Sequence, residues 1–178
     1  MKHQPGVGSS PEITHSMGHY LMAIRDQLRE LGYARVTDIA NRLDISRSSA
    51  SVAMASLRDK GYLTEDKNHF YRLTEEGERL ATHIYGNHLL LESFFMKVLG
   101  ISQETSLRDS CQIEHLLSRE TSQKMLCFVQ YLLDHEDELN TLLDRIRNYR
   151  TECSQQGACH LCMGESECPF HDLEEEAT

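Results

Sequence analysis

The sequence lacks any long hydrophobic run, and this absence limits where the protein can act. No stretch approaches the roughly 20 consecutive apolar residues that a membrane-spanning helix needs. The opening segment, MKHQPGVGSSPE, contains no apolar core of the kind found in signal peptides. We therefore expect a cytoplasmic protein with no membrane partner. Cytosolic thiols stay reduced, so the six cysteines are expected to bind metal, sense redox state or be buried, and not to form a disulfide scaffold.

Motifs of the common enzyme classes are missing as well. The chain contains no nucleophile elbow, no phosphate-binding loop and no general acid-base pair, and no internal repeat is visible. Its histidines are better explained by metal ligation than by catalysis. With 178 residues the chain can hold one substantial core or two small domains. We predict a binding protein that is not an enzyme.

Charge is distributed unevenly along the chain. The net charge of -10 would argue against a nucleic-acid partner, because phosphates favour basic surfaces. Residues 1–74, however, carry ten Lys and Arg against eight Asp and Glu, whereas residues 75–178 carry eight against twenty. This asymmetry suits a DNA-reading front joined to a carboxylate-rich part that could hold cations, although acidic helices are often only solvated surface.

The first half of the chain has the pattern of three helices and a hairpin. Residues 1–13 are rich in Gly, Pro and Ser and predict a flexible leader. Apolar residues at helical spacing predict helices over about 13–31, ending at Gly32, and over 34–43, capped by Thr37 or Asp38. Ser46 is expected to cap a third helix, in which Val52 or Met54 and Leu57 pack inward. β-prone segments at 62–64 and 70–73 flank a polar tip at 65–69. Residues 14–76 are therefore predicted to form a winged helix-turn-helix.

The third helix and the hairpin supply the candidate DNA-binding residues. The short polar surface of the helix could approach a major groove, and the hairpin tip could reach the flanking backbone or minor groove. For each residue taken alone, a solvated surface position is the alternative. The candidates are Thr37, Arg47, Ser48, Ser49, Ser51, Lys67, Asn68 and Arg72.

The second half predicts a helical domain, so the fold is mainly α. Thr74 and the acidic residues after it indicate a helix that could run to Leu99, where Gly100 breaks it. A further helix is expected from about Ser106 or Asp109 to Leu133, and another over about 139–149. We assign residues 77–150 to this domain.

Candidate metal ligands lie at helical spacings in three places. Cys111, Glu114 and His115 are separated by three and four residues, which would place them on one helical face. Thiolate, carboxylate and imidazole groups together can bind a first-row divalent metal. The alternative is a partly buried cysteine beside two surface residues. Two weaker sets, each typical of solvated pairs when taken alone, are His88 with Glu92, and His15 with His19 and Met22.

These segments together resemble the iron- and manganese-dependent repressors, the family of the diphtheria toxin repressor and the manganese transport regulator. The similarity covers roughly residues 15–135, and three stretches carry it: GYARVTDIANRLDISRSSASVAMASLRDKGYL, FYRLTEEGERLA and CQIEHLLS. The resemblance implies a winged helix-turn-helix followed by a metal-binding and dimerisation domain. The chain ends too soon for a counterpart of the family's SH3-like domain, so none is expected. By resemblance, the family's ligand positions are occupied by His19, Met22, His88, Glu92, Cys111, Glu114 and His115.

The chain departs from the family pattern at several of these positions. His19 stands where relatives carry Met or Asp, and Met22 stands where manganese regulators carry a carboxylate. Leu107 stands where iron regulators carry a further His, whereas Cys111 follows the iron-type pattern. Histidine and cysteine ligands shift preference from Mn(II) toward Fe(II), with Zn(II) or Co(II) chemically possible. We expect Fe(II) to be favoured and Mn(II) to remain an alternative.

A polar, Cys-rich tail follows, over residues 151–178. Its cysteines have the spacing C-x5-C-x2-C-x5-C and could hold an iron-sulfur cluster or Zn(II), or remain an unliganded thiol-rich tail. The x5 spacings and the Cys-Pro pair favour the cluster, whereas His160 and His171 keep mixed zinc ligation open. The four cysteines are Cys153, Cys159, Cys162 and Cys168.

The leading hypothesis from the sequence is a homodimeric, metal-dependent transcriptional repressor that controls metal-homeostasis genes. Each third helix would enter one half-site of a pseudo-palindromic operator in double-stranded DNA. A second hypothesis is a winged-helix accessory or adaptor protein that engages a protein partner and whose tail is the active part. Metal storage is a third and weaker hypothesis.

Overall fold

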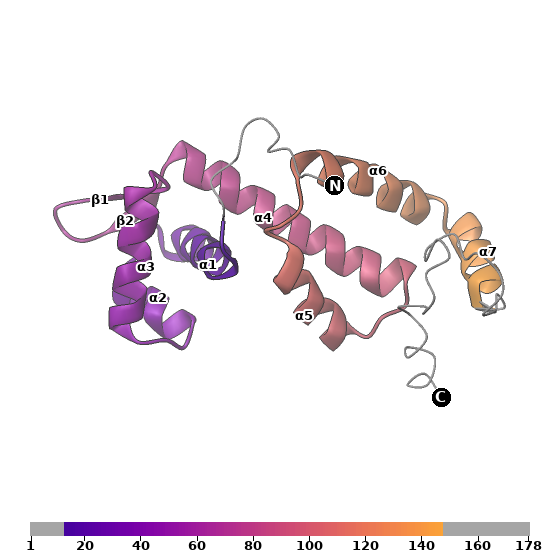
Figure 1. Cartoon of the computed structure of the whole chain (residues 1–178), viewed down its shortest axis with the longest axis horizontal. Coiled ribbons are helices and arrows are strands. Elements are labelled where there is room, and N and C mark those ends of the chain that lie inside the picture. Colours follow the sequence, from indigo (N-terminus) through magenta and orange to yellow (C-terminus); the bar gives the residue numbers. More distant parts are fainter. Residues whose placement is uncertain (1–12, 148–178) are drawn as a thin grey trace, which may run out of the picture. The chain divides into compact units, whose positions relative to one another are not determined.

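The computed structural model describes residues 13–147, and most of them are helical (Figure 1). The first part contains α1 (His15–Leu31), α2 (Val36–Arg42), α3 (Arg47–Asp59) and the strands β1 (Leu63–Glu65) and β2 (Tyr71–Leu73). α4 (Glu75–Ser93) follows and continues into a π-helical turn, η1 (Phe94–Val98). The remaining helices are α5 (Gln103–Ile113), α6 (Arg119–Asp134) and α7 (Glu136–Arg147).

Capping side chains explain where several helices begin. The hydroxyl of Ser46 accepts the Ser49 N–H at 3.0 Å, and that of Thr74 accepts the Gly77 N–H at 3.0 Å, as the sequence predicted. The prediction for α2 was wrong, because its N-cap is Arg35, which makes no side-chain capping bond. The Tyr71 N–H donates to the Ala34 carbonyl, so the chain leaves the sheet at Ala34 and the helix starts immediately afterwards.

α1, α2, α3 and the hairpin form a winged helix-turn-helix, as predicted. β1 and β2 pair antiparallel, with Leu63 opposite Leu73, and Ala34 bridges to Tyr71 on the other edge of β2. The helices enclose one hydrophobic core, whose fully buried members include Leu21, Ile24, Ile39, Met54 and Leu57. Of the two inward candidates on α3, Met54 is the buried one and Val52 is 72% exposed.

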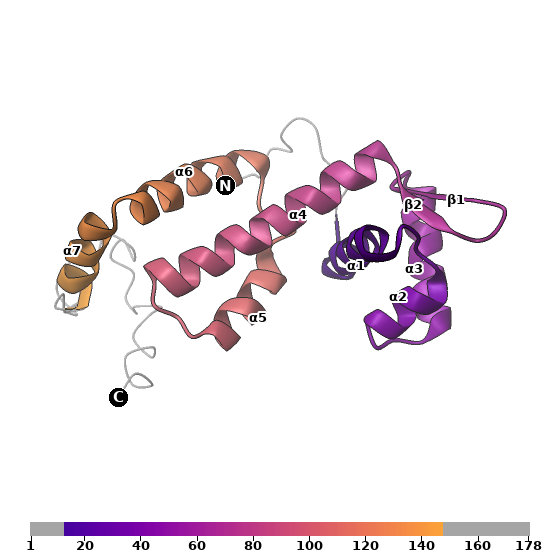
Figure 2. The ribbon, with the colours of Figure 1, turned by 180° about the vertical axis from the view of Figure 1, so that it is seen from behind.

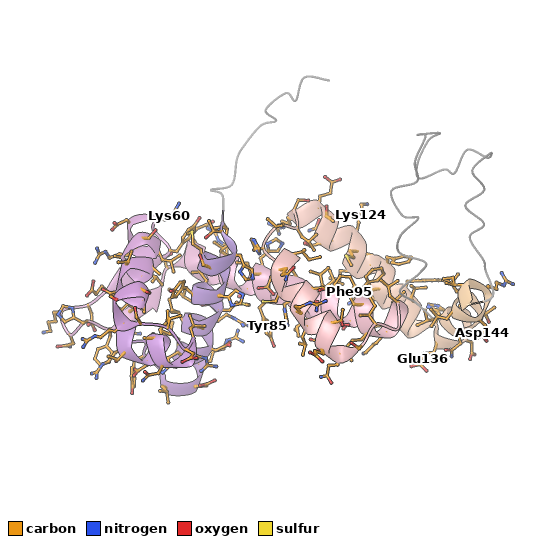
Figure 3. The ribbon with its side chains drawn as sticks, turned by 60° about the horizontal axis from the view of Figure 1, so that its bottom comes forward. Lys60, Tyr85, Phe95, Lys124, Glu136 and Asp144 are labelled. Atoms are coloured by element: carbon orange, nitrogen blue, oxygen red, sulfur yellow. The ribbon has the colours of Figure 1, made fainter. Side chains whose placement is uncertain are left out.

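α4 connects the winged helix to the helices that follow it. It packs against α1 near the winged helix and against α5 and α6 further along (Figures 1 and 2). The Arg25 guanidinium of α1 lies 4.2 Å from the centroid of the Tyr85 ring of α4, and Tyr85 is labelled in Figure 3. Ile84 is buried in the same contact region. α1 is therefore held by α4 as well as by the winged-helix core.

Two helices replace the single helix that was expected from residue 106 or 109 to 133. α5 already starts at Gln103, where Ser102 caps it, and it ends at Ile113, so that Glu114 and His115 begin a turn. Ser118 then caps α6 by accepting the Thr121 N–H at 3.1 Å. The sequence did contain a signal for this break: a capping serine followed by Glu120 in the first turn. The helix expected to reach Leu99 is α-helical only to Ser93.

The described residues up to His135 form one compact unit, and α7 belongs to a second. Within residues 13–147 no helix is long and apolar enough to cross a membrane. The Cys-rich tail and most of the predicted leader lie outside the described residues.

Candidate metal centre and nucleic-acid interface

Two histidines of α1 and one cysteine of α5 aim their ligand atoms at one another. The Sγ atom of Cys111 lies 2.9 Å from Nε2 of His19 and 3.7 Å from Nε2 of His15. The two Nε2 atoms are 3.0 Å apart. Cys111 follows His19 by 92 residues and His15 by 96 residues in the sequence, so only tertiary packing brings the cysteine to the two histidines.

Local geometry explains how α1 presents both histidines. His15 and His19 are one helical turn apart and therefore share a face of α1. Gly18 lies between them and is buried, and a Cβ atom there would lie 3.6 Å from the Cβ of His115, an ordinary van der Waals distance. Gly18 therefore marks the place where α1 packs against the turn after α5.

A second group lies between α4 and the end of α5. Nδ1 of His88 lies 2.7 Å from Oε2 of Glu114, and Nε2 of His88 lies 4.0 Å from Oε2 of Glu92. The hydrogen bond to the buried Glu114 carboxylate raises the pKa of His88. The Asn87 amide also donates to the Glu114 carbonyl at 2.7 Å, which anchors the turn after α5 to α4.

Burial prepares the other donors differently for ligation. Burial, together with the neighbouring His15, lowers the pKa of both His19 and His115 and so favours the neutral imidazoles that bind metals. Burial and the nearby Glu114 carboxylate raise the pKa of the Cys111 thiol. A cation would have to displace the thiol proton before Cys111 could bind it.

The residues present fit a divalent cation. Oε1 of Glu114 and Nδ1 of His115 are buried and have no hydrogen-bond partner in the described part of the chain. Buried polar atoms without partners are costly, and a bound ion is one way to satisfy them. Imidazole, thiolate and carboxylate donors together suit a first-row divalent metal.

The structure gathers most of the predicted metal ligands in this region. His19, Cys111, His115 and the His88–Glu114 pair are linked by the contacts and electrostatic interactions described above. Met22 instead packs against the winged-helix core, and its ligand role stays a prediction. His15 was grouped with His19 by spacing only, and the resemblance gave it no role. Its place in the cluster follows from the packing of α1.

A hollow of about 620 Å³ lies between the start of α2, the exposed side of α3 and the hairpin. It brings together four of the predicted DNA-binding residues: Thr37, Arg47, Ser51 and Asn68. Lys67 and Arg72 are exposed on the hairpin but do not line it. The hydroxyls of Ser48 and Ser49 both contact Ser46 at 2.8 Å, so they take part in the cap of α3.

The same hollow is lined by two arginines that the sequence analysis missed. Arg35 stacks its guanidinium 4.2 Å from the centroid of the Phe70 ring, which orients it beside the hairpin. Arg58 is held by Glu65 at 2.7 Å. Both arginines belong to the segment that resembles a helix-turn-helix. Their position in the hollow depends on how the hairpin folds back over α3.

The fold and this arrangement of donors define the class of protein. A family model described as the iron dependent repressor N-terminal DNA binding domain matches residues 12–69. A second model, the iron dependent repressor metal binding and dimerisation domain, matches residues 74–143. The chain therefore belongs to the iron-dependent repressor family, which confirms the resemblance noted in the sequence.

Individual relatives are transcriptional regulators. The HTH-type transcriptional regulator MntR of Geobacillus kaustophilus (strain HTA426) is 37% identical over 105 residues, which are 59% of this chain and 74% of that protein. The protein of the same name from Listeria monocytogenes serotype 4a is 33% identical over 129 residues, 72% of this chain and 90% of that protein.

Solved structures share the fold. The crystal structure of T. acidophilum IdeR matches with a TM-score of 0.52 and 26% identity over 67% of this chain. That of ScaR with bound Zn2+ matches with a TM-score of 0.54 and 26% identity over 65% of this chain. In both cases the match covers 54% of the solved chain, so this chain spans about half the length of these structures.

Proposed function

We propose that the protein is a metal-dependent transcriptional repressor that binds double-stranded DNA as a homodimer. The observation that carries the proposal is the contact of His19 on α1 with Cys111 on α5. α1 belongs to the core of the winged helix, whereas α5 lies in the segment matched by the metal-binding model. A cation held by these two side chains would tie the DNA-reading part to the metal-binding part. Metal occupancy would thereby select one arrangement of the reading head.

The DNA partner is supported by the surface beside α3. Arg35, Arg47 and Arg58 border the hollow between α3 and the hairpin, and arginine is the commonest side chain in specific base and phosphate contacts. Val52, 72% exposed on α3, offers an apolar group of the kind that contacts thymine methyl groups. We assign α3 to the major groove and the hairpin to the flanking backbone.

A homodimer is supported by the match to a dimerisation domain and by exposed apolar side chains on α6. Leu126 is 44% exposed and Phe128 is 51% exposed. In a symmetric dimer each subunit would read one half of a pseudo-palindromic operator. The residues we assign to DNA binding are those proposed from the sequence, together with Arg35 and Arg58.

We further propose that Fe(II) is favoured over Mn(II). Histidine at position 19 and cysteine at position 111 supply nitrogen and sulfur, whereas Mn(II) prefers oxygen donors. A bound cation would supply the positive charge that joins these donors to the buried carboxylate of Glu114. Glu92 and His88 would hold that carboxylate in position or bind a second ion.

The test is an anaerobic electrophoretic shift assay on a duplex selected from a random-sequence pool with the metal-loaded protein. Binding should require Fe(II) or another divalent cation and should weaken steeply with salt as counterions are released. His115→Ala should abolish the metal response while leaving a folded dimer, and His135→Ala, an exposed histidine outside the cluster, should not. Two outcomes would favour the adaptor hypothesis: DNA binding that is the same with and without every cation tested, or failure to select any duplex from the pool.

A further inference from the structure

His15 is the member of the α1–α5 cluster to which the family resemblance gives no role. Its Nε2 atom lies 3.0 Å from that of His19 and 3.7 Å from the Cys111 sulfur. The three ligand atoms all lie within 4.8 Å of one another. Among the described residues, His15, His19 and Cys111 form the group of three His, Cys, Asp or Glu side chains that lie close enough together to hold a metal ion. His15 itself is exposed, so no packing requirement explains why its ring faces the cluster.

We propose that His15 is a direct ligand that completes a two-nitrogen, one-sulfur site with His19 and Cys111. This inference deepens the proposed function and rests on its metal site. The site would take a divalent cation that accepts thiolate and imidazole, such as Fe(II), Co(II) or Zn(II), and would discriminate against Mn(II). His15 is thereby a specificity-determining residue of this chain.

The distances between the donor atoms support the assignment. Tetrahedral bond lengths of about 2.05 Å to nitrogen and 2.3 Å to sulfur imply edges of about 3.3 Å between nitrogens and 3.6 Å from nitrogen to sulfur. The His15–His19 edge of 3.0 Å and the His15–Cys111 edge of 3.7 Å are near these values, whereas the His19–Cys111 edge of 2.9 Å is shorter than the edge expected around a cation. The His19 and Cys111 side chains would have to move apart to place a cation between the three atoms.

The charge and donor chemistry point the same way. The Nε2 atom of His19 lies within hydrogen-bond distance of both the Cys111 sulfur and the His15 Nε2 atom. A single Nε2 atom can carry at most one proton. Three lone-pair donors that face one point repel one another unless protons or a cation lie between them. His115 supplies a further imidazole nearby, since its ring centroid lies 5.3 Å from that of His15. His115 is not one of the three residues whose ligand atoms lie within 4.8 Å of one another, so its ring would have to move to act as a fourth donor.

Selectivity follows from the type of donor added. Affinity for nitrogen and sulfur ligands rises along the first row from Mn(II) through Fe(II) to Co(II), whereas oxygen donors suit Mn(II). A second imidazole in the site therefore strengthens binding of the later ions more than that of Mn(II). Removing His15 should weaken Co(II) binding more than Mn(II) binding.

The experiment uses Co(II) as the probe, because its absorption reports the ligands directly. Co(II) is titrated anaerobically into the 178-residue chain in which Cys153, Cys159, Cys162 and Cys168 are replaced by serine. We expect a sulfur-to-cobalt charge-transfer band that Cys111→Ser removes. His15→Ala should weaken Co(II) binding at least about tenfold, since even outer-shell changes cost 10- to 100-fold, and should shift the visible d–d bands. His135→Ala is the matched control and should change neither.

The outcomes separate this inference from the proposed function. An unchanged Co(II) affinity and spectrum in His15→Ala would overturn the ligand assignment and leave a hydrogen-bonded cluster only. Metal-dependent DNA binding by that variant would show that the proposed function stands without it. A protein that binds no Co(II) at all would overturn both. A spectrum that depends on His15, in a protein whose DNA binding ignores cations, would support the ligand assignment and overturn the proposed function.

Discussion

Nδ1 of His88 and Oε2 of Glu114 are joined by a 2.7 Å hydrogen bond across 26 residues of sequence. Glu114 is only 1% exposed, so its carboxylate is shielded from solvent and depends on this contact. The bond connects α4 to the turn that carries Glu114 and His115. The relative position of the candidate metal ligands is thus set by α4, the helix that also packs against α1.

This pair predicts how the stability of the metal-free protein depends on pH. The pKa of His88 is raised in the folded state by its bond to Glu114. Its contribution to the free energy of unfolding is therefore fully present below the ordinary histidine pKa of about 6.5, and is lost as pH rises through the folded value. In chelator-treated protein, the stability difference between the wild type and His88→Gln should be largest near about pH 5.5 and decline at alkaline pH. Urea unfolding at several pH values measures it, and a difference that grows with pH would contradict this account.

The Cys111 thiol predicts the pH dependence of metal binding. Its raised pKa keeps it protonated near neutral pH, so each bound cation should release one proton from it. In the chain with serine at the four tail positions, Co(II) affinity should rise about tenfold per pH unit between about pH 7 and 8. Isothermal titration in buffers of different ionisation enthalpy counts the protons. Cys111→Ser should remove that proton, and an equal release from this variant would rule out the thiol as its source.

Two glycines of α4 should respond in opposite ways to the same substitution. A Cβ atom at Gly77 would lie 2.1 Å from the Tyr62 carbonyl oxygen, which is itself held by the Thr74 N–H. Gly77→Ala should destabilise the protein by about 1–3 kcal/mol or more, because backbone must move. At Gly86 a Cβ would meet nothing within 4 Å, so Gly86→Ala should stabilise it by about 0.5–1 kcal/mol. Denaturant unfolding of both variants checks the contrast, which equal effects would refute.

Arg47 should contribute directly to DNA binding. It stands in the first turn of α3, is exposed and lines the hollow beside the hairpin. A bidentate base contact is worth about 1–3 kcal/mol, so Arg47→Ala should weaken operator binding by roughly 5- to 150-fold at matched salt. Arg108→Ala, which removes an exposed arginine of α5, should have little effect. Equal losses from the two variants would indicate a general charge effect instead of a contact.

The four tail cysteines lie outside the described residues, and we predict that they bind one iron-sulfur cluster or one zinc ion. Replacing all four with serine should remove one class of bound metal and leave the helix-borne cation in place. Elemental and acid-labile sulfide analysis of anaerobically purified protein measures both classes. Identical metal content in the two proteins would show that the tail is an unliganded, thiol-bearing extension.

Local sequence determined the winged helix and most of the helices. The caps at Ser46 and Thr74, the stop at Gly32 and the β-prone segments around a polar tip all act within a few residues of the chain. Such interactions are visible in the sequence because a helix or hairpin brings only near neighbours together. For the same reason, spacing alone predicted that Cys111, Glu114 and His115 share one helical face, whereas the helix ends at Ile113 and the backbone turns at Glu114 and His115.

Only the tertiary structure decided which elements meet. His15 and His19 face Cys111 because α1 and α5 both pack against α4. Arg35 and Arg58 line the same hollow because the hairpin folds back over α3. Helical periodicity fixes the face on which a residue lies, but it carries no information about the partner of that face. The partner depends on the packing of side chains from segments distant in the sequence. That packing brings together both the candidate metal ligands and the candidate DNA-binding residues.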